Sequence, residues 1–242
     1  MVSKNQIKLI TSLVQKKYRD KHKLFVAEGI KVIEELYTEG LILQNLYTIS
    51  LFDKIEKENQ QLVTELELKK ISNLKTPQTA LAVFSIPEAK NIDITRWIVV
   101  LDDIRDPGNL GTIIRLCDWY GISTLVCSPE TVDCYNPKVV QSTMGSIARV
   151  GVHYQELDLF FEETQLPVYG TFMDGENVYK NQLPKQGILV LGNEANGISS
   201  EVEKMADKKI SIPRFGKKKT ESLNVAMAAA IFLSEIHRAI EM

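Results

Sequence analysis

From residue 96 to the end of the chain, short apolar runs alternate with segments whose apolar residues recur at helical spacing. The runs are WIVVLDD (97–103), STLVCS (123–128), PVYGTF (167–172), GILVLGNE (187–194) and KKISIP (208–213). Helical patterns start at about 110, lie near 137–148 and fill 221–241. Such strands between helices predict an α/β fold with a mostly parallel sheet covered on both faces. Ligands of these sheets bind where loops leave the carboxyl ends of the strands.

The first ninety residues predict a separate, smaller α/β unit. Ile7, Ile10, Leu13 and Val14 form a helical stripe, and the helical segment 30–40 ends at Gly40. The runs LFVAEG (24–29), LQNLYTIS (43–50) and ALAVFSIP (80–87) have β character. A polar stretch near 87–95 has no strong period and predicts a linker. We therefore expect two domains, 1–90 and 96–242.

The composition narrows the class of protein. No apolar run approaches the roughly 18 residues of a membrane span, and the polar start does not match a secretory signal, which predicts a cytoplasmic protein without a membrane segment. Three cysteines, Cys117, Cys127 and Cys134, lack CxxC spacing. They are expected to be reduced thiols rather than disulfide partners or zinc ligands.

Positive charge is concentrated near the N-terminus, although the whole chain carries only −2. Residues 1–31 hold eight Lys or Arg against Asp20 and Glu28, a local balance of +6. The densest part, 16–23, predicts RNA phosphate contacts through Lys16, Lys17, Arg19 and Lys23. A solvated helix face is the alternative.

Three loops that follow apolar runs carry the candidate chemistry: DPGNLGTIIR (106–115), LGNEANGIS (191–199) and IPRFGKKKTESLNVAMAAAI (212–231). Each places glycine or proline beside polar residues, where the backbone can approach a flat ligand. Gly192 suggests a close approach and Gly197 a reversal of the chain, while Thr220 or Ser222 is expected to cap the terminal helix. One such loop could be a plain turn, but three at one sheet edge predict a site.

The motifs in these loops resemble those of a known family. They are Asn109-x-Gly111-x-x-x-Arg115, then Leu191-Gly192-Asn193-Glu194-x-x-Gly197, then Ile212-Pro213 with Glu221-Ser222-Leu223-Asn224-Val225-Ala226. This set resembles the SpoU branch of the SPOUT methyltransferases, the TrmH family of RNA ribose 2′-O-methyltransferases. The N-terminal Lys17-Tyr18-Arg19, Phe25-Val26-Ala27-Glu28-Gly29 and Lys75-Thr76-Pro77-Gln78 resemble the family's L30e-like substrate-binding domain.

The resemblance implies a SPOUT domain with a deep trefoil knot, S-adenosylmethionine as methyl donor and a homodimer that completes the active site. No metal is required, because the donor carries the reactive group. By motif, the donor would contact Thr171, Gly192, Asn193, Ile198, Ile212, Leu223 and Asn224. The catalytic set would be Arg115, Asn109, Glu194, Ser222 and Asn224. Lys217, Lys218 and Lys219 could meet the RNA backbone or form a charged loop.

Arg115 is the central candidate. Family proposals make this arginine a base, but an arginine side chain rarely gives up its proton, which favours a bidentate phosphate clamp, with Asn109 orienting it or the ribose. The alternative is an exposed helical residue paired with Asp118 or an acidic loop neighbour. Arg149 is a further possible RNA contact.

The predicted substrate is structured RNA, with ribosomal RNA favoured over transfer RNA because an L30e-like domain grips folded RNA. A non-catalytic knotted RNA-binding protein is the alternative function. A nicotinamide or flavin oxidoreductase is disfavoured because GxGxxG is absent.

Overall fold

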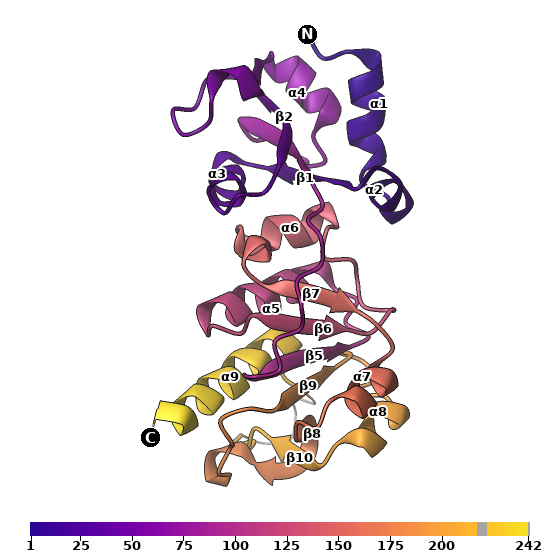
Figure 1. Cartoon of the computed structure of the whole chain (residues 1–242), viewed down its shortest axis with the longest axis vertical. Coiled ribbons are helices and arrows are strands. Elements are labelled where there is room, and N and C mark those ends of the chain that lie inside the picture. The colour runs from indigo at the N-terminus through magenta and orange to yellow at the C-terminus, as the bar shows by residue number, and fades with distance from the viewer. Residues whose placement is uncertain (217–221, 242) are drawn as a thin grey trace. The chain divides into compact units, whose positions relative to one another are not determined.

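The computed structural model of the protein describes residues 1–216 and 222–241 and consists of two compact units (Figure 1). The first unit contains Met1–Glu88 together with Asp133–Arg149, and the second contains Ala89–Val132 and the chain from Val150 onward. The expected linker near 87–95 coincides with the first passage between the units. The segment 133–149 leaves the second unit and returns to it.

The first unit is built on a four-stranded sheet of order β1-β4-β2-β3. Its strands are β1 (Leu24–Glu28), β2 (Leu43–Thr48), β3 (Gln60–Leu62) and β4 (Ala80–Ser85). Strand β4 runs antiparallel to β1 and β2, and β3 is parallel to β2. The helices are α1 (Lys4–Ser12), α2 (Lys16–His22), α3 (Ile30–Thr38), α4 (Glu65–Ile71) and α6 (Pro137–Thr143), with short 3-10 turns at Lys57–Asn59 and Ser146–Ala148. The predicted small α/β unit is confirmed.

The predicted helical stripe at the N-terminus extends past the end of its helix. A capping box of Ser3 and Gln6 starts α1, which ends at Ser12. Ile10 and Leu13 are buried in the core, as the stripe predicts, but Val14 is 45% exposed because the chain has already left the helix. The stripe therefore predicted its last member wrongly.

Segment 133–149 forms part of the core of the first unit. Helix α6 contacts β1, and the ring of Tyr135 lies 4.9 Å from the ring of Phe25. Gly145 has φ +99°, and a Cβ there would lie 2.5 Å from Cβ of Glu35, so only glycine fits this close approach. Segment 133–149 therefore packs against β1 and α3 as part of the first unit.

The second unit contains a six-stranded sheet of order β10-β8-β9-β5-β6-β7, in which every pairing is parallel. The strands are β5 (Ile98–Asp102), β6 (Thr124–Cys127), β7 (Gly151–Tyr154), β8 (Val168–Asn177), β9 (Ile188–Gly192) and β10 (Lys208–Ser211). The helices are α5 (Pro107–Trp119), α7 (Leu157–Glu163), α8 (Ser200–Met205) and α9 (Val225–Glu241), with a 3-10 turn at Val178–Lys180. Helices α5 and α9 pack together on one face, and α7 and α8 on the other (Figure 1). The predicted parallel α/β sheet is confirmed.

Burial explains why the strands were recognisable in the sequence. Ile98, Val100, Val126, Ile188 and Val190 are buried at the centre of the sheet. These strands are covered on both faces, so almost every residue in them is apolar. In the described parts of the chain, no helix is long and apolar enough to cross a membrane.

Candidate active site at the carboxyl ends of the strands

A cavity of about 680 Å³ opens where β8, β9 and β10 end and α9 begins. Small-molecule sites commonly have volumes of roughly 300–1,000 Å³. Its lining includes residues of the second and third motif loops and of β8: Thr171, Gly192, Asn193, Glu194, Ile212, Ser222 and Leu223. The structure thus brings five of the predicted donor-contacting residues to one cavity. Asn224 lies in an adjacent hollow, and Ile198 is buried in the core beside the loop.

The turn after β9 shapes one wall of this cavity. Asn193 and Gly197 exchange two backbone hydrogen bonds of 3.0 and 2.9 Å, and Gly197 has φ +72°. The returning chain passes so close to Gly192 that a Cβ there would lie 2.3 Å from both Gly197 C and Ile198 N. The absence of a side chain at Gly192 is therefore a steric requirement of the loop.

The inner part of the cavity is apolar. Leu191, Val225 and Phe232 are nearly fully buried and line it together with Ala228. Thr171 donates its hydroxyl to the carbonyl of Val190, 2.9 Å away, which ties β8 to β9 just after their paired residues. Backbone from the loops and apolar side chains from β9 and α9 are what a flat, partly apolar cofactor such as S-adenosylmethionine needs.

A chain of hydrogen bonds connects the three motif loops at the mouth of the site. Asn224 Nδ2 donates to Asn109 Oδ1 over 2.9 Å, and Asn109 Nδ2 donates to Glu194 Oε1 over 2.6 Å. Asn109 lies in the first turn of α5, whose cap is the carboxylate of Asp106, 2.8 Å from the Asn109 N–H. Three predicted catalytic residues from distant parts of the sequence are thus in direct contact.

Asn224 also caps helix α9. Its Oδ1 accepts from the backbone N–H groups of Ala226 and Met227, at 3.0 and 3.3 Å. The expected cap was Thr220 or Ser222, but Ser222 precedes the helix by three residues and Thr220 lies outside the described residues. The cap moves to Asn224 because α9 begins at Val225.

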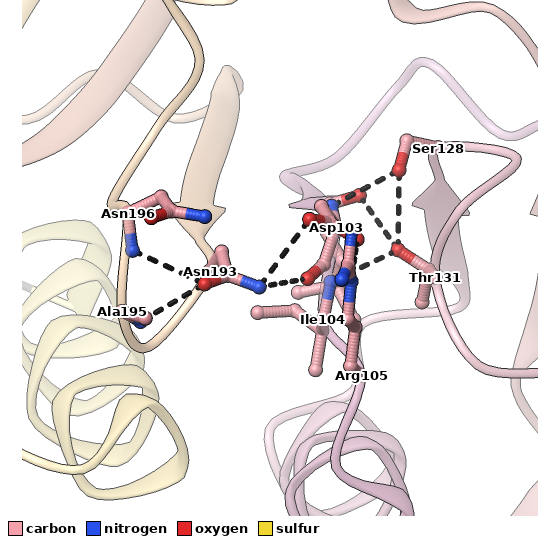
Figure 2. A network of polar contacts seen from close by, with 9 residues as sticks. Asp103, Ile104, Arg105, Ser128, Thr131, Asn193, Ala195 and Asn196 are labelled. Atoms are coloured by element: carbon pink, nitrogen blue, oxygen red, sulfur yellow. Dashed lines mark hydrogen bonds and ion pairs between the residues drawn. The ribbon is translucent and has the colours of Figure 1, made fainter.

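A second network joins the turn after β5 to the second motif loop (Figure 2). The side-chain amide of Asn193 donates to the carbonyl of Asp103 over 2.7 Å, and its Oδ1 accepts from Ala195 and Asn196 N–H. Next to it, the buried carboxylate of Asp102 accepts from Ser199 N–H at 2.7 Å. The Asn193 side chain therefore fixes the shape of the cavity wall, and a donor would meet the backbone of this loop.

These aspartates were not predicted as functional residues. In the sequence, Asp102 and Asp103 only mark the end of the apolar run 97–103. Acidic side chains directly after a parallel strand are a usable signal, because that strand end faces the ligand edge.

Arg115 lies on the exposed face of α5, with Thr112 and Trp119 one turn to either side. Its side chain makes no hydrogen bond or ion pair with any residue in 1–216 or 222–241, so the alternative pairing with Asp118 is not observed. Asn109, which was expected to orient Arg115 or the ribose, contacts Glu194 and Asn224 rather than Arg115, and its contact with a ribose stays a prediction. Arg115 does not line the cavity.

The predicted RNA-contacting cations of the first unit divide into two groups. Lys16, Lys17 and Lys23 are exposed. Arg19 is only 2% exposed, donates to the carbonyls of Leu13 and Val14, and forms an ion pair with Asp133. Its prediction as an RNA contact is corrected, because a buried and fully bonded guanidinium cannot reach a phosphate.

Two further basic predictions have different outcomes. Arg149 donates to Glu35 and Glu39 at 3.1 and 3.0 Å, which ties it to the first unit. Lys217, Lys218 and Lys219 lie outside the described residues.

The three cysteines are buried and form no disulfide among the described residues, as predicted. Burial raises the pKa of the Cys117 thiol to about 12. No group of three or more His, Cys, Asp or Glu side chains suited to a metal ion occurs among the described residues.

The parallel sheet, the cavity at its strand ends and the hydrogen-bonded motif loops fit a methyltransferase of the SpoU class, and the comparisons agree. The model described as SpoU rRNA Methylase family matches residues 96–234, and an MRM3-like substrate binding domain matches residues 4–82. The chain belongs to the SpoU rRNA methylase family. The predicted family, and with it the class of S-adenosylmethionine-dependent RNA methyltransferases, is confirmed.

Particular relatives cover nearly the whole chain. The 23S rRNA (guanosine(2553)-2′-O)-methyltransferase RlmP of Bacillus subtilis is 32% identical over 96% of both chains. A putative RNA methyltransferase of the TrmH family from Porphyromonas gingivalis is 36% identical, with a TM-score of 0.88 over 98% of this chain and 99% of that chain. The AdoMet-bound rRNA methyltransferase from Sinorhizobium meliloti is 28% identical, with a TM-score of 0.86 over 98% and 97%.

Proposed function

We propose that this protein transfers a methyl group from S-adenosylmethionine to a ribose 2′-hydroxyl of ribosomal RNA. The observation that carries the proposal is the hydrogen-bonded chain Asn224–Asn109–Glu194 beside the cavity. It places polar groups for a ribose next to a pocket suited to the donor. The relative RlmP, named for 2′-O-methylation of a guanosine in 23S rRNA, supports ribosomal RNA over transfer RNA.

The donor would supply an activated methyl group, and the protein's part is to align the reactants and exclude water. Gly192, Asn193, Ile212 and Leu223 would hold it through backbone and apolar contacts, with Thr171 tying β8 to β9 beside them. As in the family, the C-terminal segment would pass through a trefoil knot. The hydrogen-bonded pair of Asn109 and Glu194 would contact the ribose.

We assign Arg115 to the binding of the RNA phosphate next to the target ribose, acting across a homodimer. The α5–α9 face exposes large apolar side chains: Trp119 is 82% exposed and Met227 62%. Apolar residues this exposed favour a covered interface. In a two-fold dimer formed by this face, each Arg115 would serve the site of the partner, since it does not line its own cavity.

The cellular location follows from the proposed substrate. We expect a cytoplasmic protein, because ribosomal RNA must be accessible and the three buried cysteines form no disulfide in the described chain.

The test uses Arg115→Ala. The variant should bind S-adenosylmethionine with wild-type affinity in calorimetry but methylate RNA at least about 100-fold more slowly, since a charged clamp on a reacting group is lost. Wild-type turnover by this variant would show that the assignment of Arg115 is wrong. Absence of donor binding by the wild type would refute the proposed function itself.

Mixed dimers test whether Arg115 acts in the partner's site. Arg115→Ala and Asn224→Ala each lose most of their activity under the proposal, but an exchanged mixture contains dimers with one intact site. Equal mixing should restore about a quarter of wild-type activity, because about half of the dimers are mixed and each has one working site of two. No recovery would place Arg115 in its own subunit's site.

A further inference from the structure

A polar hollow of about 640 Å³ adjoins the donor cavity on the other side of the loop 193–196. Its lining comprises Arg105, Asp106, Asn109, Asn193, Glu194, Ala195, Asn196 and Asn224. Within the described chain, Arg105 is the only cation in that lining. It is not part of the three motifs on which the family resemblance depends.

The backbone that leads to Arg105 is held in an uncommon conformation. Asp103 has φ +58°, a left-handed value that is strained for a non-glycine residue and often marks a functional site. Ser128 Oγ accepts from Asp103 N–H at 3.0 Å, and Thr131 Oγ1 accepts from Ile104 N–H at 3.2 Å. Figure 2 shows these bonds on one side of the turn and Asn193 on the other.

This turn buries Ile104 and directs the next side chain outward. Ile104 is fully buried, whereas the side chain of Arg105 is 70% exposed. The strained turn therefore fixes the point at which the Arg105 side chain leaves the backbone, beside the first and second motif loops.

The guanidinium is held at one edge and open at the other. Arg105 Nε donates to Asp103 Oδ1 over 2.7 Å, and this contact raises the pKa of Arg105 above its ordinary value. Its two Nη groups make no hydrogen bond within residues 1–216 and 222–241. Two parallel N–H donors match the geometry of a phosphate.

The carboxylates around the hollow are engaged in the protein's own contacts. Asp106 accepts from Asn109 N–H at the start of α5, and Glu194 accepts from the Asn109 side chain. They repel an anion deep in the hollow, which favours contact at the exposed Arg105 end. A phosphate held there would lie on the backbone of a strand whose ribose enters the hollow.

We infer that Arg105 binds a backbone phosphate of the substrate RNA beside the target nucleotide, and that Asp103 positions its guanidinium for this contact. The inference rests on the proposed function, because it needs an RNA strand at this site. Arg105 then fixes which nucleotide of the RNA strand lies at the hollow. Asn193, which bonds to Asp103, connects this position to the wall of the donor cavity.

The test measures RNA affinity and its salt dependence for Arg105→Ala, with the ribosomal RNA transcript that the wild type methylates. Loss of one charged phosphate contact should raise KM for RNA about 10-fold and leave the affinity for S-adenosylmethionine unchanged. The slope of log K against log salt should fall by about 0.7, the value for one phosphate on a single strand. Arg105→Lys should keep the slope but recover only part of the affinity, because lysine lacks the fork.

Lys185→Ala is the matched control. Lys185 is an exposed cation just before β9, at the amino end of the sheet, opposite to the motif loops. The control should leave KM and the salt slope at wild-type values. If Arg105→Ala does the same, the inference is wrong while the proposed function stands. If the wild type methylates no ribosomal RNA, both fail.

A double-mutant cycle tests the part assigned to Asp103. Asp103→Asn can retain the left-handed turn, because asparagine tolerates that conformation. It should raise KM for RNA less than Arg105→Ala does, and the double variant should be no worse than Arg105→Ala alone. Additive effects would show that Asp103 acts independently of Arg105.

Discussion

Replacing Gly192 by alanine adds one methyl group where the loop returns past the end of β9. The new Cβ would lie 2.3 Å from Gly197 C and Ile198 N, whereas ordinary contact begins at 3.4 Å. Both neighbours are backbone atoms, so the turn 193–197 must move by about 1 Å. A misplacement of this size can cost roughly 100-fold in rate, and it acts on the wall of the donor cavity.

Calorimetry with S-adenosylmethionine is the assay for this variant, with circular dichroism to verify folding. We expect donor affinity to fall at least about 10-fold in a folded protein, because the cavity wall is displaced. Gly121→Ala is the control: Gly121 also has positive φ, at +65°, but a Cβ there meets nothing within 4 Å. It should lose some stability and bind donor normally. Wild-type donor affinity in Gly192→Ala would refute the assignment of this cavity.

Three further predictions concern stability and reactivity. Asp133→Ala should lower the free energy of unfolding by about 3–5 kcal/mol in urea titrations, because it leaves the buried Arg19 guanidinium without its carboxylate; a change below about 1 kcal/mol would contradict this. Asn224→Ala should destabilise the protein by about 1 kcal/mol through loss of the α9 cap and should also reduce methylation, since the bond to Asn109 is lost; normal turnover would argue against the polar chain. Cys117 should resist a thiol reagent at pH 8 in the folded protein and react after unfolding, because its pKa of about 12 leaves almost no thiolate; rapid native labelling would contradict the burial.

Sequence periodicity predicted the elements that are buried on both faces. Strands β5 and β9 read as continuous apolar runs because they lie at the centre of the parallel sheet. The edge strand β7, with half-buried Val152 and His153, was missed because it lacks that pattern. It was also not predictable that segment 133–149 belongs to the first unit. Its packing, for example of Tyr135 on Phe25, depends on contacts between residues distant in sequence.

The candidate site was predictable where residue type alone determines the role. Gly192 and Gly197 follow from backbone geometry, and the structure gives both the expected close approach and the positive φ. Arg19 shows the limit of such reasoning. A cation in a basic segment was expected to face solvent, but Asp133, 114 residues away, gives it a buried partner.

The network around Asp103 also depends on contacts between residues that are distant in sequence. Nothing in the local sequence indicates that Asn193 will contact it, since the two residues meet only when β5 and β9 pair. Contacts made by strand pairing become visible only in the folded structure.

The most direct test of the central claim is a map of ribose 2′-O-methylation in ribosomal RNA from cells with and without this gene. The account predicts that deletion removes the signal at one nucleotide, and that the wild-type gene restores it while a gene encoding Arg115→Ala does not. A ribosomal RNA map that is identical in both strains would contradict the proposed function. Restoration of the signal by the Arg115→Ala gene would contradict the role given to that arginine.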